Sequence, residues 1–142
     1  VLADTVRETV SRLNPLAKKR GQQIVVKIQD ECEMFADSGK LAQVCYNIIE
    51  NAIKYTPAGG NIAICVEEDA LHISDTGIGI APEDLPRIFE KGYTGENGRL
   101  ERTSSGLGLY LAGKAADMLH IPIHVESTVG RGTAFTLHLR QK

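Results

Sequence analysis

Residues 41–57 read LAQVCYNIIENAIKYTP, and this stretch decides how the rest of the chain can fold. Its apolar side chains recur at i, i+3, i+4, i+7, i+8 and i+11, the spacing of one face of an α-helix. The stripe consists of Leu41, Val44, Cys45, Ile48, Ile49 and Ala52. Asp37 can cap the start of the helix, and Pro57 with the glycine pair after it ends it. We therefore expect a long helix with one face against the core.

Helical and β-strand periodicities alternate along the rest of the chain. Before the long helix, residues 4–20 have helical spacing, with a capping box formed by Thr5 and Glu8 and a stop at Gly21. Strands are predicted at 23–28, 33–36, 61–67, 71–74, 123–127 and 134–140. Pro82, Pro86 and the acids between them predict a short helical turn near 83–89, and a third helix is predicted at 107–119. The sequence thus predicts an α/β two-layer sandwich, with three helices covering one face of a mixed, mostly antiparallel sheet.

Size and composition exclude several classes of protein. The 142 residues suit one domain, residues 1–142, with a core of its own. A formal net charge of −2 with scattered Lys and Arg gives no sign of a nucleic-acid partner. No apolar run approaches the roughly 20 residues needed to span a membrane, and the start of the chain does not resemble a signal peptide. Cys32, Cys45 and Cys65 lack CxxC spacing, so we expect free thiols in a reducing cytosol.

The long helix also carries three polar residues on one face. Asn47, Asn51 and Lys54 follow i, i+4, i+7 spacing, so they lie beside the apolar stripe. Two amides and an ammonium in line suit phosphates and a metal ion, since an amide oxygen is a ligand that Mg²⁺ accepts. A solvated polar helix face would show the same pattern, so that alternative stays open.

A second polar motif, DTGIGI at residues 75–80, directly follows a predicted strand. A carboxylate at a strand end can accept a hydrogen bond from an exocyclic amino group, and the glycines let the backbone approach a flat ring. A plain turn is the alternative. The dinucleotide fingerprint is excluded because Pro82 stands where it needs glycine, and the chain contains no P-loop pattern.

Two further glycine-rich motifs lie near the C-terminus. SSGLGL at residues 104–109 opens the third predicted helix, and a helix start binds phosphate through its free N–H groups. GRGT at residues 130–133 precedes the last strand. A flexible hinge and a simple hairpin are the respective alternatives. Residues 90–105 are polar and glycine-rich, so we expect a long loop that acts as a lid.

The order of these motifs resembles the GHKL superfamily of ATP-binding proteins, also called the Bergerat fold, and within it the histidine kinase catalytic domain. The resemblance covers essentially the whole chain. The matching segments are the N box at 47–57, the G1 box at 75–80, the F box at 87–92, the G2 box at 105–109 and the last glycine motif at 130–135. Ser104 departs from the family, which often has glycine there.

The resemblance implies ATP and Mg²⁺ as cofactors and assigns a role to each matching residue. Asn51 would ligate Mg²⁺, with Asn47 near the phosphates, Lys54 on a phosphate and Tyr55 stacked on adenine. Asp75 would bind the adenine amino group, assisted by Gly79 and Thr133, while Arg87 and Phe89 would order the lid. Gly106, Leu107, Gly108 and Leu109 would wrap the triphosphate, and Gly77, Ile80, Lys91, Gly92 and Ser105 would complete the binding set.

Asn47 separates this chain from the ATPase branches of the superfamily, which place a water-activating Glu at that position. A neutral amide cannot be a general base, so the γ-phosphoryl group would be kept for a protein acceptor. Asn47, Asn51 and Lys54 would then be the catalytic set of an ATP-dependent protein-histidine kinase. A serine-directed kinase of the anti-sigma-factor type and a non-catalytic nucleotide-sensing module remain as alternatives.

The acceptor is not expected within this chain. None of the four histidines fits the family's phosphoacceptor pattern: His72, His124 and His138 fall in predicted strands, and His120 ends a helix. The chain also begins without an initiator methionine, which indicates a fragment. We therefore expect a soluble, monomeric fragment whose partners are a histidine-bearing dimerisation domain upstream and a response regulator. The whole protein would be a dimeric sensor kinase in the cell membrane, with this domain in the cytoplasm.

Overall fold

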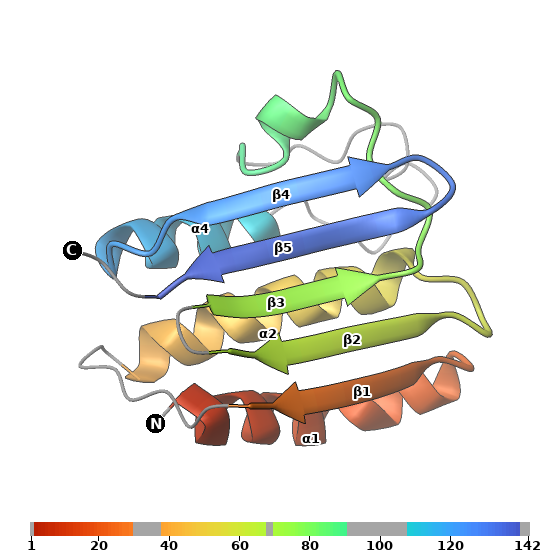
Figure 1. Cartoon of the computed structure of the whole chain (residues 1–142), viewed down its shortest axis with the longest axis horizontal. Coiled ribbons are helices and arrows are strands. Elements are labelled where there is room, and N and C mark those ends of the chain that lie inside the picture. The colour runs from red at the N-terminus through yellow and green to blue at the C-terminus, as the bar shows by residue number, and fades with distance from the viewer. Residues whose placement is uncertain (1, 30–37, 68–69, 91–107, 140–142) are drawn as a thin grey trace.

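The computed structural model describes residues 2–29, 38–67, 70–90 and 108–139. It has two layers, a β-sheet and a layer of helices that covers one face of it (Figure 1). The elements are α1 (Leu2–Lys19), β1 (Gln23–Ile28), α2 (Ser38–Tyr55), β2 (Asn61–Val66), β3 (Ala70–Asp75), the 3₁₀ turn η1 (Leu85–Arg87), α4 (Gly108–Met118), β4 (Ile123–Thr128) and β5 (Gly132–His138). The predicted α/β two-layer sandwich is therefore confirmed.

The five strands lie in the order β1-β2-β3-β5-β4. β1 and β2 run parallel, and the other three neighbouring pairs run antiparallel. Two parallel neighbours need a crossover connection, and α2 lies in the segment that joins them. The sheet is mixed and mostly antiparallel, as predicted.

The strand register arranges the helix-facing side chains in three rows across the sheet. Two rows are entirely apolar: Ile28, Val66, Leu71, Leu137 and Ile123, then Val26, Ile64, Ile73, Phe135 and Val125. The third row begins with Ile24 and Ile62 and continues with Asp75, Thr133 and Ser127. We call these last three residues the polar row. The covered face thus changes from apolar to polar at one end, where β3 ends and β5 begins.

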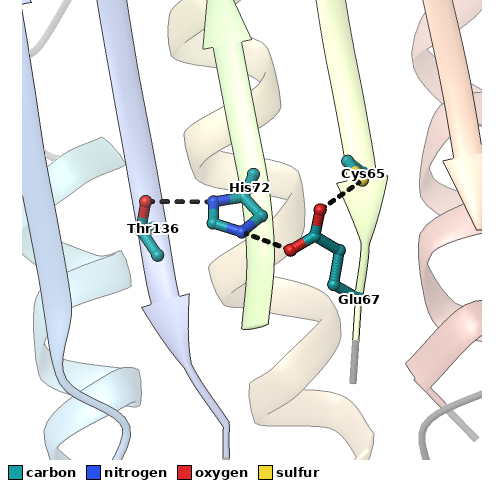
Figure 2. Close-up of polar contacts among 4 residues, drawn as sticks. All are labelled: Cys65, Glu67, His72 and Thr136. Carbon is teal, nitrogen blue, oxygen red and sulfur yellow. Dashed lines mark hydrogen bonds and ion pairs between the residues drawn. The ribbon is translucent and has the colours of Figure 1, made fainter. Parts of the chain in front are cut away.

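The uncovered face of the sheet carries a different set of side chains (Figure 2). His72 Nδ1 lies 3.2 Å from Thr136 Oγ1, and His72 Nε2 lies 3.4 Å from a carboxylate oxygen of Glu67. Cys65 donates to the other oxygen of Glu67 at 3.7 Å. His72, His124 and His138 all lie on strands, as predicted, and His120 follows α4. His72 is therefore held by its neighbours on the sheet.

The central helix, α2, packs between α1 and α4 and against the sheet (Figure 1). The predicted apolar stripe is buried along its length, and Ile53 adds to it. Cys45 lies in this stripe as a free thiol, and burial raises its pKa to about 12. Cys65 is also free, while Cys32 lies outside the described residues. In the described part of the chain, no helix has the length and apolarity that crossing a membrane requires.

Two details of the prediction are wrong. α1 begins at Leu2, so Thr5 and Glu8 lie inside the helix and form no capping box; the Thr5 carbonyl accepts a hydrogen bond from the Thr9 hydroxyl at 2.8 Å. β5 begins at Gly132 rather than residue 134, because Gly132 already pairs with Thr128. The predicted strand at 33–36, the cap at Asp37 and the loop from residue 91 onward lie outside the described residues.

The rows predict where the sheet tolerates substitution. Ile73 is 1% exposed at the centre of an apolar row, so Ile73→Ala should lower the free energy of unfolding by about 2–5 kcal/mol. His124 lies on the uncovered face, and His124→Ala should change it by less than about 0.5 kcal/mol. Urea denaturation of both variants measures the difference. Equal losses would contradict a core on one face only.

Candidate functional site

The DTGIGI turn folds back onto the last turn of α2. The Ile78 N–H donates to the Tyr55 carbonyl at 3.1 Å. A Cβ on Gly77 would lie 2.3 Å from the Tyr55 carbonyl oxygen and 2.7 Å from Asp75 Oδ1, so no side chain fits there. The glycine in this motif therefore lets the N box and the G1 box meet backbone to backbone.

The same turn is also tied to the β4–β5 hairpin. Gly79 has φ +79°, and a Cβ on it would lie 2.3 Å from the Thr128 carbonyl oxygen. The Gly130 N–H donates to the Ile78 carbonyl at 2.9 Å, and the Ile80 N–H donates to Ser127 Oγ at 2.7 Å. The end of α2 and the β4–β5 hairpin, which are far apart in the sequence, thus both contact residues 75–80.

Asp75 is the ionisable group at this junction. Its Oδ1 accepts the Gly77 N–H at 2.8 Å, and the Thr133 backbone N–H also bonds to its carboxyl group. Burial raises the pKa of Asp75, and these two hydrogen bonds offset only part of the rise. A half-buried carboxylate with spare lone pairs is a strong acceptor for an amino group on a ligand.

The polar face of α2 extends away from this junction. Asn47, Asn51 and Lys54 are all half-buried, and Lys54 Nζ lies 3.8 Å from Glu50 Oε1. Asn47 lines a cavity of about 480 Å³ between α1 and α2, and its buried Nδ2 has no hydrogen-bond partner among the described residues. An unpaired buried donor costs about 1–3 kcal/mol, which a phosphate oxygen would offset. The three residues of this face are donors of the kind that bind phosphates, and of the three Asn47 lines the cavity while Asn51 and Lys54 do not.

The fit to a metal ion rests on amide oxygens. No group of three or more His, Cys, Asp or Glu within the described ranges could hold a metal. A metal on α2 would therefore take an oxygen of Asn51 and complete its shell with phosphate oxygens and water, which is how Mg²⁺ commonly binds.

A smaller cavity of about 210 Å³ is lined by the whole polar row, Asp75, Thr133 and Ser127. Its lining also includes Ser74, Glu126 and Ala134. Those three residues belong to an outward-facing row, next to but opposite in direction to the polar row. Because the side chains of the polar row face the helices, we place the candidate site on the covered face, against α2.

Phe89 packs into the core rather than standing free. Its ring meets that of Phe135 edge to face, with centroids 6.4 Å apart. Gly113 of α4 leaves room for it, because a Cβ there would lie 3.2 Å from the ring. Arg87 Nε lies 3.4 Å from Glu90 Oε1. Phe89 is thereby anchored against α4, and the proposed role of Arg87 and Phe89 in ordering a lid stays a prediction.

The structure brings together one part of the predicted site. Tyr55, Asp75, Gly77, Gly79, Ile80 and Thr133 form a single junction. Asn47 lies about 12 Å from Tyr55 along the helix axis, at 1.5 Å per residue. Gly108 opens α4 and Leu109 packs on the core. Lys91, Gly92, Ser105, Gly106 and Leu107 lie outside the described residues.

Two groups of residues near the site were not predicted from the sequence. Gln22 donates through Nε2 to the carbonyls of Ile53 and Thr56, and Arg20 donates to that of Lys54 at 3.0 Å. They bind the end of α2 from far away in the chain, so no local pattern could reveal them. Ser127 was detectable in principle: it follows Ile123 and Val125 at inward positions of a strand, where an apolar residue is expected.

Comparison with known proteins agrees with this fold. The chain shares its fold with the mycobacterial sensor histidine kinase MprB (TM-score 0.80, 22% identity, 96% of this chain and 92% of that one). In sequence it is 36% identical to the sensor histidine kinase GraS of Staphylococcus haemolyticus, over 93% of this chain and 39% of that protein. It is 44% identical to the sensor protein BceS of Bacillus subtilis, over 74% of this chain and 32% of that protein.

The family model described as histidine kinase-, DNA gyrase B- and HSP90-like ATPase matches residues 36–142. The chain therefore belongs to this family. It spans only about a third of the length of the curated relatives, 39% of GraS and 32% of BceS.

Asp75 predicts an unusual pH dependence of stability. Because its folded pKa is raised, the folded state holds the proton more tightly than the unfolded state, and stability falls as pH rises from about 4, the ordinary Asp pKa. Asp75→Asn should be more stable than the wild type at pH 7, and the difference should shrink towards pH 3. Urea denaturation across this range measures it. A variant less stable at every pH would show that the lost hydrogen bonds dominate.

Proposed function

We propose that this chain binds Mg-ATP and transfers the γ-phosphoryl group to a histidine on the dimerisation domain of the same sensor kinase. The observation that carries the proposal is the junction of the polar row with the end of α2. It offers a carboxylate acceptor, glycine backbone without side chains, and Tyr55 within one small region. A 6-aminopurine base is a flat ligand with an amino donor, which this combination suits.

The phosphates would then extend along α2 towards Asn47. Lys54 and Asn51 follow Tyr55 in that direction, and the unpaired Nδ2 of Asn47 is a donor for the terminal phosphate. When bound, Mg²⁺ supplies neutralisation of the phosphate charge, and Asn51 is the residue we assign to hold it. Phosphoryl transfer depends mainly on such positioning and charge stabilisation.

Asn47 supports transfer to a protein rather than to water. An amide neither accepts a proton from water at neutral pH nor gives one up, so it does not provide a general base. His72 contacts Glu67 and Thr136 on the sheet face opposite α2, so it is not presented to the proposed phosphate site. An imidazole from another domain would complete the reaction.

The wider setting follows from the same proposal. The partners would be the dimerisation and histidine-phosphotransfer domain and a response regulator, in a dimeric kinase of a two-component system. This chain would be the cytoplasmic part of a membrane protein. The names of the curated relatives GraS and BceS, a sensor histidine kinase and a sensor protein, support this reading.

Asn51 tests the metal assignment. Asn51→Ala should reduce phosphotransfer by at least about a hundredfold, because charge stabilisation in the transition state is lost. Its affinity for ADP without Mg²⁺ should stay within about twofold, since the proposed contacts to the base remain. Phosphotransfer with labelled ATP and calorimetry with ADP measure the two effects. Full activity in the variant would rule out the assignment.

Transfer in trans tests the reaction itself. Alone, the chain should bind Mg-ATP without hydrolysing it or labelling itself. With the separate dimerisation domain it should label a histidine slowly, because no tether raises the effective concentration. The product should be labile to acid and stable to base. Rapid hydrolysis would indicate an ATPase, an acid-stable product a serine-directed kinase, and binding without transfer a nucleotide-sensing module.

A further inference from the structure

Ser127 has three polar neighbours and a single hydrogen to share. Its Oγ lies 2.7 Å from the Ile80 nitrogen, 2.9 Å from the Gly132 carbonyl oxygen and 2.9 Å from Thr133 Oγ1. A backbone N–H can only donate and a carbonyl can only accept. Ser127 therefore accepts from Ile80 and gives its hydrogen to Gly132, so the hydrogen between the two hydroxyl groups must come from Thr133.

Because its hydrogen is donated to Ser127, the Thr133 hydroxyl can only accept further hydrogen bonds. Thr133 stands between Ser127 and Asp75 in the polar row, directly opposite both in the strand register. Side chains of directly opposite residues on neighbouring strands lie on the same face, with Cβ atoms about 5 Å apart. The row therefore offers two neighbouring acceptors, the Asp75 carboxylate and the Thr133 hydroxyl oxygen.

We propose that Ser127 is a positioning residue that holds the Thr133 hydroxyl as an acceptor and so makes the site select a 6-amino over a 6-oxo purine nucleotide. The inference rests on the proposed nucleotide site. An exocyclic amino group has two hydrogens, one for Asp75 and one for Thr133. A 6-carbonyl group would face lone pairs at both positions.

Removing Ser127 has two separable effects. The Ile80 N–H loses its acceptor. This loosens the turn and lowers the affinity for every nucleotide equally. The Thr133 hydroxyl also becomes free to rotate, so it can donate to a carbonyl on the ligand. Only the second effect changes the preference between bases, and so it distinguishes a positioning role from a purely structural one.

The test compares ATP with inosine triphosphate, which differs from ATP at position 6 of the purine. Calorimetry on the whole chain with Mg²⁺ should show that Ser127→Ala lowers the ATP-to-ITP affinity ratio by about threefold to tenfold, the range for one hydrogen bond. Ser127→Thr, which keeps the hydroxyl, should preserve the ratio. Ser74→Ala, on the outward-facing position next to Asp75, is the matched control and should also preserve it.

A double-mutant cycle tests whether Ser127 acts through Thr133. In a Thr133→Val background, Ser127→Ala should leave the ratio unchanged. If Ser127→Ala does not fold, Ser127→Cys keeps the shape with a weaker hydrogen-bonding group and should lower the ratio in the same direction. Equal losses of ATP and ITP affinity, or the same drop without Thr133, would overturn the inference. A wild-type chain that binds neither nucleotide would refute the proposed function, and this inference with it.

Discussion

The packing of α2 against one face of the sheet is the interaction on which the rest of the structure depends. The helix buries an apolar stripe on the two apolar rows, and its last turn reaches the polar row. The carbonyls of that turn are bound by Gln22, Arg20 and the Ile78 N–H rather than left to solvent. These bonds supply the partners that a helix end lacks, and they hold the side chains of the last turn against residues 75–80.

The polar row lowers the stability of the fold, and it also supplies the groups of the proposed site. The other helix-facing positions of the sheet are apolar, whereas Asp75 is a carboxyl group whose pKa is raised by burial. Its neighbours limit the penalty by donating backbone N–H groups. Gly77 and Gly132 have no space for a side chain, because a Cβ would lie 2.3 Å or less from a backbone oxygen. A half-buried acceptor surrounded by backbone without side chains suits a flat ligand.

Much of the fold could be predicted because the periodicity of apolar residues identifies helices and strands locally. The stripe from Leu41 to Ala52 and the alternation around Phe135 each repeat within a few residues, so they identify a helix and a strand directly. The N-terminus of α1 was misplaced because Thr5 and Glu8 match a capping pattern while standing inside the helix. The start of β5 was missed because glycine has low strand propensity. In the structure Gly132 pairs with Thr128, so the strand begins there.

The sequence by itself determined the elements, the sidedness of the sheet and the order of the polar motifs, because each depends on residues close together in the chain. Only the tertiary structure decided which of these motifs share a site. It set Ser127 and Thr133 beside Asp75 through strand register, and Gln22 under the end of α2 across more than thirty residues. Such contacts depend on how distant backbone segments align, and a one-residue shift in register would turn the side chains of the shifted strand to the other face.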